Sequence, residues 1–299
     1  MHRSGFVTIV GKPNVGKSTF INQIIGEKIA IVSEKPQTTR NTIRGIYNTD
    51  ESQIIFIDTP GIHKPKHRLG ALISDAAVAT IGAVDLVLWM INAVEPMEDI
   101  DRMIAERLKT IGTPTFLILN KTDLAEDFDR LAILVEKYRK LLSFKGVFGI
   151  SALKNQHLED LLKDISDALP EGPKYYPEDQ VTDHPEKFMI AELIREKVLR
   201  LTHEEIPHSV TVIIDSMAPD EERPHLMNIH ATVVVERDSQ KGIIIGKAGN
   251  MLKQIGTHAR QDILALLGMK IYLDLHVKVI KNWRNKEIHL RNFGYNESL

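Results

Sequence analysis

Short apolar runs recur along the first 170 residues and alternate with stretches that have helical spacing. The clearest runs cover residues 6–10, 54–57, 115–119 and 147–150, and each is followed by a polar or glycine-containing loop. Continuous apolar runs of this length are typical of parallel strands with both faces buried. The pattern therefore predicts an α/β domain whose mainly parallel sheet is covered by helices on both faces.

Prolines and glycines separate this region from a second one. The stretch 170–177 contains three prolines, so it cannot continue a helix and is interpreted as part of a linker. We expect a first domain over residues 1–170, a linker over 171–184 and a second domain over 185–299. The pattern of the second domain predicts a smaller α+β fold in the order helix, strand, strand, helix, helix, strand. Its clearest elements are a helix over 185–203, strands over 209–215 and 226–236, a helix to about 267 and a strand over 270–279.

The charge is nearly balanced overall but unevenly distributed. The chain has 38 Lys and Arg against 40 Asp and Glu, which gives a net charge of −2. Residues 241–299 hold ten basic and four acidic side chains, a net +6 that leaves −8 on residues 1–240. A basic C-terminal region indicates a polyanionic partner. The chain has no cysteine and no signal-like start, so we expect a cytoplasmic protein without a transmembrane helix, with peripheral membrane contact left open.

The loop after the first apolar run has the sequence of a phosphate-binding loop. It follows a strand and opens a helix over 19–25, so its N–H groups would surround the phosphates of a nucleotide. Lys17 would reach the β and γ phosphates, and the Ser18 hydroxyl would bind Mg²⁺. The expected nucleotide contacts here are Gly11, Lys12, Pro13, Asn14, Val15, Gly16, Lys17, Ser18 and Thr19.

Two further strand-end loops predict which base is bound. The tetrapeptide Asn120-Lys121-Thr122-Asp123 follows the run 115–119, at the sheet edge where open α/β domains bind ligands. The Asp123 carboxylate can accept from both N1–H and the 2-amino group of guanine, whereas adenine would leave it unpaired. The loop Ser151-Ala152-Leu153 could support the base through backbone N–H groups.

The tetrapeptide Asp58-Thr59-Pro60-Gly61 follows the run 54–57 and completes the set. An Asp at the end of such a strand can hold the Mg²⁺ shell. Gly61 has no side chain to obstruct its N–H, which can approach a γ-phosphate, and Ile62 follows it.

These motifs, in this order, resemble the GTPase domain of the translation-factor-related small GTPases. The resemblance implies GTP hydrolysis to GDP, with Lys17, Thr39 and Gly61 as catalytic residues and Ser18, Thr39 and Asp58 around Mg²⁺. Thr39 lies in the polar stretch 37–41, where this class has its first switch. The adjacent Thr38 and Thr42 remain alternatives for the metal ligand.

One position departs from the Ras-like pattern. Ile62 stands where those proteins have the glutamine that orients the attacking water, and Ile62 cannot form that hydrogen bond. His63 is a weak substitute in a polar loop. We therefore expect slow intrinsic hydrolysis that a partner or K⁺ accelerates, because Asn14 resembles the asparagine that holds K⁺ in cation-activated relatives.

The second domain contains a glycine loop, 246–249, between two expected helices, with Lys241, Lys247 and Lys253 around it. This arrangement resembles a KH domain of bacterial topology, whose loop clamps about four nucleotides of single-stranded RNA. Basic and aromatic residues alternate after the last strand, where the aromatics either stack on bases or pack on their own domain. The expected RNA contacts are Lys241, Gly246, Lys247, Ala248, Gly249, Lys253, Lys281, Trp283 and Arg284.

The combination of the two domains over nearly the whole chain is similar to a family of bacterial GTPases. This similarity implies a monomer that binds 16S rRNA near its 3′ end, acts in 16S rRNA processing and assembly of the small ribosomal subunit, and does not bind DNA. The alternatives are a membrane-associated signalling GTPase and a passive RNA-binding module with a regulatory nucleotide site.

Overall fold

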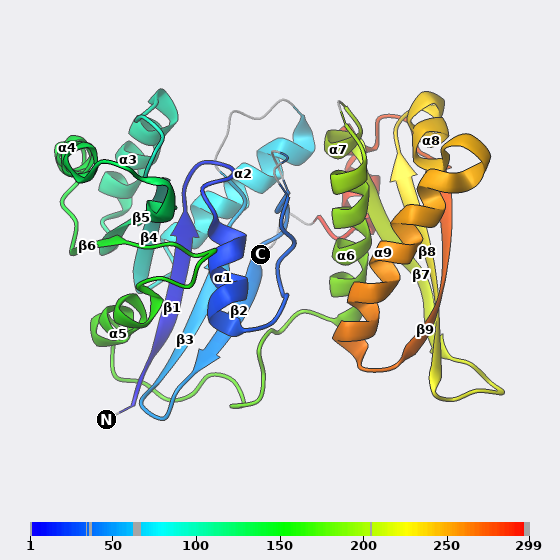
Figure 1. The fold of residues 1–299 in the computed structure, drawn as a ribbon, viewed down its shortest axis with the longest axis horizontal. Helices are drawn as coiled ribbons and strands as arrows, with labels where there is room; N and C mark the ends of the chain where they lie inside the picture. Colours follow the sequence, from blue (N-terminus) through cyan, green and yellow to red (C-terminus); the bar gives the residue numbers. More distant parts are fainter. Residues whose placement is uncertain (1, 34, 36–37, 62–66, 204, 296–299) are drawn as a thin grey trace. The chain divides into compact units, whose positions relative to one another are not determined.

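The computed structural model describes residues 2–33, 35, 38–61, 67–203 and 205–295. It forms two compact units, shown in Figure 1. The first unit contains Met1–Ala30, Thr39–Pro65 and Gly70–Asp183. The second contains Ile31–Thr38, Lys66–Leu69 and His184–Leu299. Two short segments from the N-terminal part of the sequence therefore group with the C-terminal unit.

The first unit has a six-stranded sheet in the order β2-β3-β1-β4-β5-β6. All neighbouring strands are parallel except β2, which is antiparallel to β3. The predicted mainly parallel sheet is therefore confirmed. The strands are β1 (Arg3–Val10), β2 (Ile43–Asn48), β3 (Ser52–Asp58), β4 (Leu86–Asn92), β5 (Thr115–Asn120) and β6 (Gly146–Gly149).

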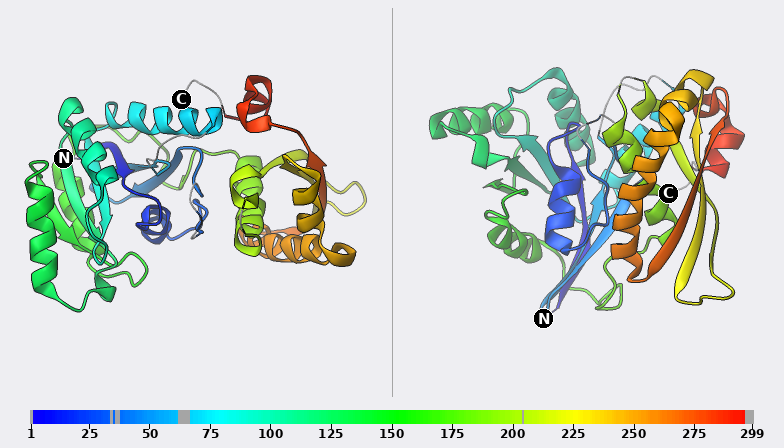
Figure 2. Two further views of the ribbon diagram at one scale, coloured as in Figure 1. Left: turned by 90° about the horizontal axis from the view of Figure 1, so that it is seen from above. Right: turned by 45° about the vertical axis from the view of Figure 1, so that its right-hand side comes forward.

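Helices cover both faces of this sheet, as Figure 2 shows. Apolar residues of α2, α3 and α4 pack with Val10 of β1 and Trp89 of β4 on one face. Phe20 of α1 contacts Phe56 of β3 edge-on, with 5.8 Å between ring centroids, on the other face. The helices are α1 (Lys17–Ile25), α2 (Arg68–Ile81), α3 (Asp99–Ile111), α4 (Phe128–Arg139) and α5 (Leu158–Ala168), with the short 3-10 helix η1 (Thr122–Leu124).

The second unit has a three-stranded sheet in the order β7-β8-β9, with β7 antiparallel and β9 parallel to the central strand. Helices α6 and α9 contribute apolar residues to one core with this sheet. The elements are α6 (Glu186–Leu201), α7 (Ile206–Ser209), β7 (Thr211–Pro219), β8 (Leu226–Val235), α8 (Asp238–Ile245), η2 (Lys247–Gly249), α9 (Asn250–Leu267), β9 (Lys270–Val279), η3 (Trp283–Asn285) and α10 (Glu287–Asn292).

The boundaries differ from the sequence prediction at the first strand of this unit. Residue 209 ends the short helix α7, and β7 begins at Thr211. Pro207 lies in the first turn of α7, where its fixed backbone angle suits a helix start. The apolar positions around it fit either a strand or a helix, so periodicity alone could not locate this change.

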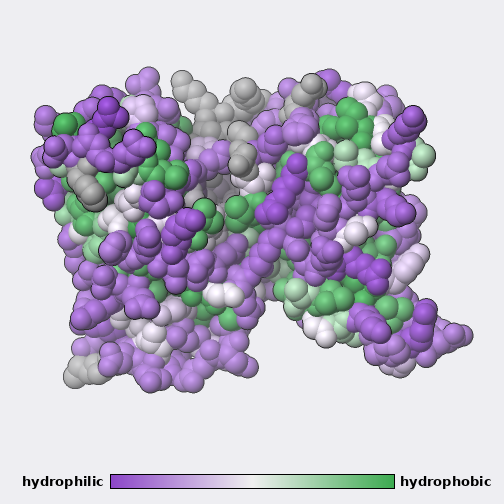
Figure 3. Space-filling view, in the orientation of Figure 1, coloured by the Kyte–Doolittle hydropathy of each residue, from purple (hydrophilic) through white to green (hydrophobic). Residues whose placement is uncertain are grey.

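The surface in the view of Figure 3 is mostly hydrophilic, with small apolar areas on both units. Among the helices of the described residues, none is long and apolar enough to cross a bilayer.

Candidate functional site

The predicted nucleotide motifs meet at one edge of the first sheet. The phosphate loop follows β1, Asp58 ends β3 and Asn120 ends β5, while Ser151 follows β6. These strands are parallel to one another, so their carboxyl ends lie at the same edge. The arrangement forms a single candidate site from segments that are up to 140 residues apart.

Two glycines of the phosphate loop have no room for a side chain. A Cβ atom on Gly11 would lie 2.2 Å from the Met90 carbonyl oxygen, and one on Gly16 would lie 2.1 Å from the Asn120 amide nitrogen. Gly16 also has a φ of 105°, which disfavours other residues. The loop is therefore shaped so that its backbone N–H groups can face a ligand.

Lys17 is held in this loop and is almost completely buried. Its ammonium group donates to the carbonyl oxygens of Gly11 at 3.2 Å and Lys12 at 2.9 Å. Burial lowers the pKa of Lys17 to about 8, although the nearby Asp58 carboxylate raises it. A buried, partly compensated cation favours an anionic ligand, because phosphate oxygens would supply the missing charge interaction.

Three oxygen-bearing side chains converge beside Lys17. The Ser18 hydroxyl donates to Asp58 Oδ2 at 2.7 Å and lies 3.1 Å from the Thr39 hydroxyl. Thr39 also donates to Asp58 Oδ2, at 3.5 Å. The Thr38 hydroxyl instead donates to Ser33 O and Lys35 O. The geometry thus favours Thr39 over Thr38 as a ligand at this position.

The Asp58 carboxylate is fully buried, and its Oδ1 atom has no hydrogen-bond partner among the described residues. Burial raises its pKa, while Lys17, Ser18 and Thr39 act in the opposite direction. A buried carboxylate with an unpartnered oxygen beside two hydroxyls is a set of hard oxygen donors. These donors fit Mg²⁺, which binds few protein ligands and keeps several of its waters.

Asn120 joins the phosphate loop to the base-binding loops. Its side-chain amide donates to Val15 O at 2.8 Å and accepts from Ala152 N at 2.9 Å. Asp123 lies in η1, three residues further on, and is exposed. The Asp123 carboxylate is therefore accessible to a base, while Asn120 fixes the surrounding loops. Leu153 is 72% exposed at the same edge.

Two of the predicted nucleotide contacts, Lys12 and Thr59, direct their side chains toward other parts of the protein. Lys12 points toward the start of α3, where its ammonium lies 3.4 Å from Asp101 and 3.5 Å from Glu98. The Thr59 hydroxyl donates to Ile9 O at 2.7 Å. These two residues can contact a nucleotide through their backbones. Asn14 is exposed at the tip of the loop with a φ of 64°. Gly61 packs against Pro13, whereas Ile62 and the segment 63–66 lie outside the described residues.

The glycine loop of the second unit lies between α8 and α9, as predicted. Gly246 has a φ of 73°, and a Cβ atom there would lie 2.9 Å from the Met251 backbone nitrogen. Gly249 has a φ of 76°, and among the described residues no atom lies within 4 Å of its would-be Cβ. A ligand backbone can therefore approach Gly249 closely. Lys247 and Lys253 are exposed beside it.

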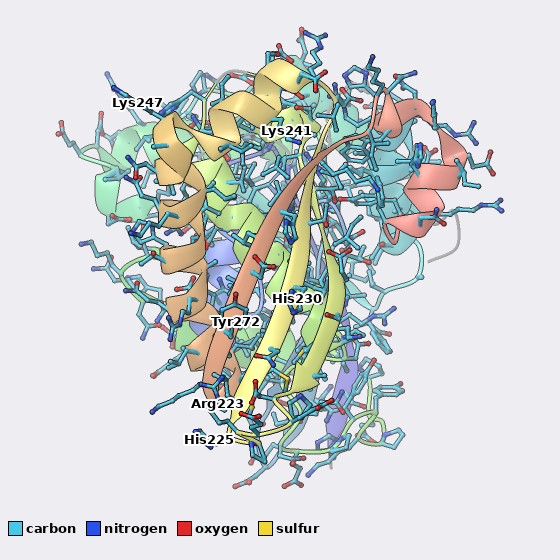
Figure 4. All side chains as sticks on the ribbon, turned by 90° about the vertical axis from the view of Figure 1, so that its right-hand side faces the viewer. Arg223, His225, His230, Lys241, Lys247 and Tyr272 are labelled. Carbon is cyan, nitrogen blue, oxygen red and sulfur yellow. The ribbon has the colours of Figure 1, made fainter. Side chains whose placement is uncertain are left out.

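A groove of about 640 Å³ runs from this loop along α9 and β9. Its walls include Lys253 and Arg260 of α9, Leu252 and Leu275 on the apolar floor, and Arg223 before β8. Tyr272 of β9 lines the groove and is 54% exposed. Figure 4 shows Lys247 near the start of α9, and Arg223, His225 and Tyr272 near the start of β9. The groove thus combines an apolar floor and an exposed ring with cations at both ends.

Sequence reasoning missed Tyr272 and misjudged two residues of the C-terminal region. Trp283 is 0% exposed, and its Nε1 donates to Ser209 O at 3.0 Å. Phe293 and Tyr295 pack against its ring. The prediction that Trp283 contacts RNA is therefore wrong, because the ring belongs to the core of its own unit. Arg284 pairs with Glu236 at 2.5 Å and is largely buried, whereas Lys281 is exposed.

Comparison with known proteins identifies a family for each unit. The family described as 50S ribosome-binding GTPase matches residues 6–121, and the KH domain family matches residues 205–284. The chain is therefore a P-loop GTPase that carries a KH domain. The predicted fold class and GTPase activity are confirmed.

Two solved structures are similar over almost the whole chain. One is Era from Aquifex aeolicus, a substituted form bound to GDP·AlF4⁻, with 40% identity over 98% of this chain and 99% of that one, and a TM-score of 0.94. The other is Era in complex with MgGDPNP and nucleotides 1506–1542 of 16S ribosomal RNA, with 40% identity, 99% coverage of both chains and a TM-score of 0.95. The chain belongs to the Era family of GTPases.

Proposed function

We propose that this GTPase is a switch that binds 16S rRNA near its 3′ end and acts in assembly of the small ribosomal subunit. The observation that carries the proposal is the 40% identity, over 99% of both chains, to an Era that binds nucleotides 1506–1542 of 16S rRNA. The groove beside the loop 246–249 supports it, because exposed cations and an accessible ring suit a single-stranded RNA.

The nucleotide site supports specific roles for the residues that converge on it. Ser18, Thr39 and Asp58 would hold Mg²⁺ and its waters, and the metal would neutralise charge that develops on the transferring phosphoryl group. Lys17 would neutralise the β and γ phosphates. Gly61 would donate its backbone N–H to the γ-phosphate, and Asp123 would select guanine.

Hydrolysis needs a group that orients the attacking water, which Ile62 cannot do. We assign slow intrinsic hydrolysis to this chain and stimulation by K⁺, bound through the exposed Asn14 at the tip of the phosphate loop. Equal hydrolysis rates in K⁺ and Na⁺ buffers would exclude the cation role. Asn14→Ala should remove the K⁺ stimulation and leave the rate in Na⁺ unchanged.

RNA binding is tested with a single-stranded RNA copied from the 3′ end of 16S rRNA. It should bind more tightly than a scrambled sequence of the same length. The double variant Lys247→Ala, Lys253→Ala should bind both RNAs more weakly. The slope of log affinity against log salt concentration should become smaller by about 2, because each substitution removes about one phosphate contact. Equal binding of the two RNAs would overturn the proposed target.

A passive RNA-binding module would keep its role in subunit assembly without GTP. Lys17→Ala, which should remove GTP binding, therefore separates the two functions: a variant that still supports assembly in cells would contradict the switch. The basic region 241–299 also fits an anionic membrane surface. Phosphatidylglycerol vesicles that displace RNA from the full chain would favour that surface as a competing partner.

A further inference from the structure

Residues 31–38, which precede the proposed Mg²⁺ ligand Thr39, are grouped with the second unit. Ile31 is 2% exposed and belongs to the same apolar core as Ile190, Leu193 and Ile194 of α6. The chain thus leaves the first unit after Ala30 and returns to it at Thr39. Ile31 at the start of this excursion therefore packs in the core of the second unit.

Side chains of α6 bind the backbone of this excursion at both of its ends. At its start, the Val32 N–H donates to Glu196 Oε1 at 3.0 Å, and Val32 O accepts from Arg200 Nη2 at 3.1 Å. At its end, Thr38 O accepts from Arg195 Nη2. These bonds involve main-chain atoms of Val32 and Thr38, so they do not depend on the side chains of these two residues.

Two of the groups on α6 that hold the segment, Arg195 and Glu196, are buried, and each forms an ion pair with a neighbouring side chain. Arg195 is 0% exposed, and its guanidinium binds both carboxylate oxygens of Glu192 at 2.6–2.7 Å. Glu196 is also 0% exposed and pairs with Lys197, which in turn pairs with Asp262 of α9. Burial disfavours the charge on Arg195, but Glu192 outweighs that effect and raises the pKa of Arg195. The two-bond pairing with Glu192 gives the Arg195 guanidinium a well-defined orientation, because leaving either buried charge unpaired is costly.

Arg195 holds the peptide group that links Thr38 to Thr39. Its carbonyl belongs to Thr38, and its nitrogen belongs to Thr39, whose hydroxyl lies 3.1 Å from Ser18 Oγ. A shift of this peptide therefore moves the Thr39 hydroxyl relative to the other oxygen donors. Conversely, a metal that draws Thr39 into its shell moves Thr38 relative to Arg195.

We propose that Arg195 is a positioning residue for GTP hydrolysis, which holds the Thr38–Thr39 peptide so that Thr39 can join the Mg²⁺ shell when a γ-phosphate is present. The proposal rests on the role given above to Thr39. It assigns to α6 of the KH-containing unit a part in forming the GTP-bound state. Arg200 assists from the start of the segment, through Val32.

The experiment compares the Mg²⁺ concentration that half-saturates the full chain with GDPNP and with GDP. Arg195→Lys keeps a cation beside Glu192, but a single ammonium cannot serve that carboxylate and Thr38 O with the same geometry. It should raise the half-saturating Mg²⁺ about tenfold with GDPNP, the size expected for one charged hydrogen bond, and leave the GDP value unchanged. The value of kcat for GTP should fall while the affinity for GDP stays constant.

Arg200→Ala is a second variant that should fold normally, because the Arg200 side chain is half-exposed. It should shift the GDPNP value in the same direction by a smaller factor. Arg291→Lys is the matched control, since Arg291 forms an exposed i,i+4 pair with Glu287 in the same unit and should change neither value.

Thr39→Ala distinguishes failure of this proposal from failure of the function proposed above. If Thr39→Ala raises the Mg²⁺ requirement with GDPNP but neither Arg195→Lys nor Arg200→Ala does, the positioning role is overturned and the metal site stands. If Thr39→Ala has no effect, Thr39 is not a ligand and both assignments fall. If Arg195→Lys raises the half-saturating Mg²⁺ equally with GDP and with GDPNP and also lowers the melting temperature, Arg195 is merely structural.

Discussion

The two candidate sites of this protein differ in how far their polar side chains are exposed. In the first unit, Lys17, Asp58 and Asn120 are buried and already bonded to backbone or to one another. In the second unit, Lys253 and Tyr272 are exposed along an open groove, and Lys247 is exposed in the glycine loop at its end. The first site is preorganised for one ligand, and the second offers a broad surface.

The difference predicts how binding energy is distributed. A buried polar group that loses its partner has a large cost, so each residue of the nucleotide site should be individually important. Exposed cations are screened and exposed rings are solvated, so each groove residue should contribute modestly. We therefore expect the nucleotide site to discriminate sharply between ligands and the groove to have an affinity for RNA that can be adjusted.

The largest effect should come from exchanging the group that reads the base. Asp123→Asn keeps one oxygen that can accept from the guanine N1–H, but it replaces the acceptor for the 2-amino group by an NH₂ group, which can donate to the 2-oxo group of xanthine. The preference for GTP over xanthosine triphosphate should change by about 10⁴-fold, the size expected when a site built to hydrogen-bond one ligand group meets a ligand that lacks it. Competition with a fluorescent GTP analogue measures both affinities. An unchanged ratio would show that Asp123 does not read the base.

Loss of the buried cation should be the next largest effect. Lys17→Ala leaves the phosphates without their partner, so GTP affinity should fall by about 10²- to 10³-fold, in line with about 3–5 kcal/mol for breaking a buried charge interaction. Isothermal titration calorimetry gives the affinity. RNA binding by the nucleotide-free protein should remain within twofold, which serves as the internal control. A GTP affinity within tenfold of the unsubstituted protein would contradict the account.

A single substitution in the groove should weaken RNA binding by less than the nucleotide-site substitutions weaken GTP binding. Tyr272→Ala should weaken RNA binding by about tenfold, within the range of about 1–3 kcal/mol for one stacked base. Tyr272→Phe keeps the ring and should bind nearly as well, so the pair separates stacking from folding. Filter binding at two salt concentrations is sufficient. If the Ala and Phe variants bind RNA equally well, Tyr272 is not a stacking residue.

The smallest effect concerns pH and sharpens the contrast between buried and exposed cations. The pKa of Lys17 is lowered to about 8 by burial, and bound phosphates should raise it. Binding above pH 8 must then take up a proton, so GTP affinity should fall about fivefold between about pH 7 and about pH 8.7. Calorimetry in buffers of different ionisation enthalpy detects the uptake. Lys17→Arg does not titrate in this range and should remove the pH dependence.

The sequence predicted the nucleotide site more completely than the groove, for a physical reason. Each nucleotide motif is a short contiguous segment at the end of a strand, and the parallel sheet necessarily brings such ends together. Asp58 and Asn120 could therefore be assigned before any contact was known. The bonds of Asp58 with Ser18 and of Asn120 with Val15 and Ala152, and the turn of the Lys12 side chain toward α3, depend on loop geometry that no local pattern specifies.

The positions of the aromatic residues of the second unit were not predicted correctly from the sequence. Tyr272 and Trp283 both lie near basic residues, and only tertiary packing places the first in the groove and the second in the core. The alternation of β9 could have indicated an outward Tyr272, because Ile271 and Leu273 lie on either side of it. No periodicity could show that residues 31–38 group with the second unit, since this follows from contacts with the distant α6.

The central claim is that the nucleotide in the first unit sets the RNA affinity of the second. The most direct test is the dissociation constant of the full chain for the single-stranded RNA from the 3′ end of 16S rRNA, measured with saturating Mg²⁺·GDPNP and with saturating GDP. The account predicts a difference of about 5- to 150-fold, with a reciprocal change in nucleotide preference when RNA is bound. Equal dissociation constants in the two nucleotide states would contradict it.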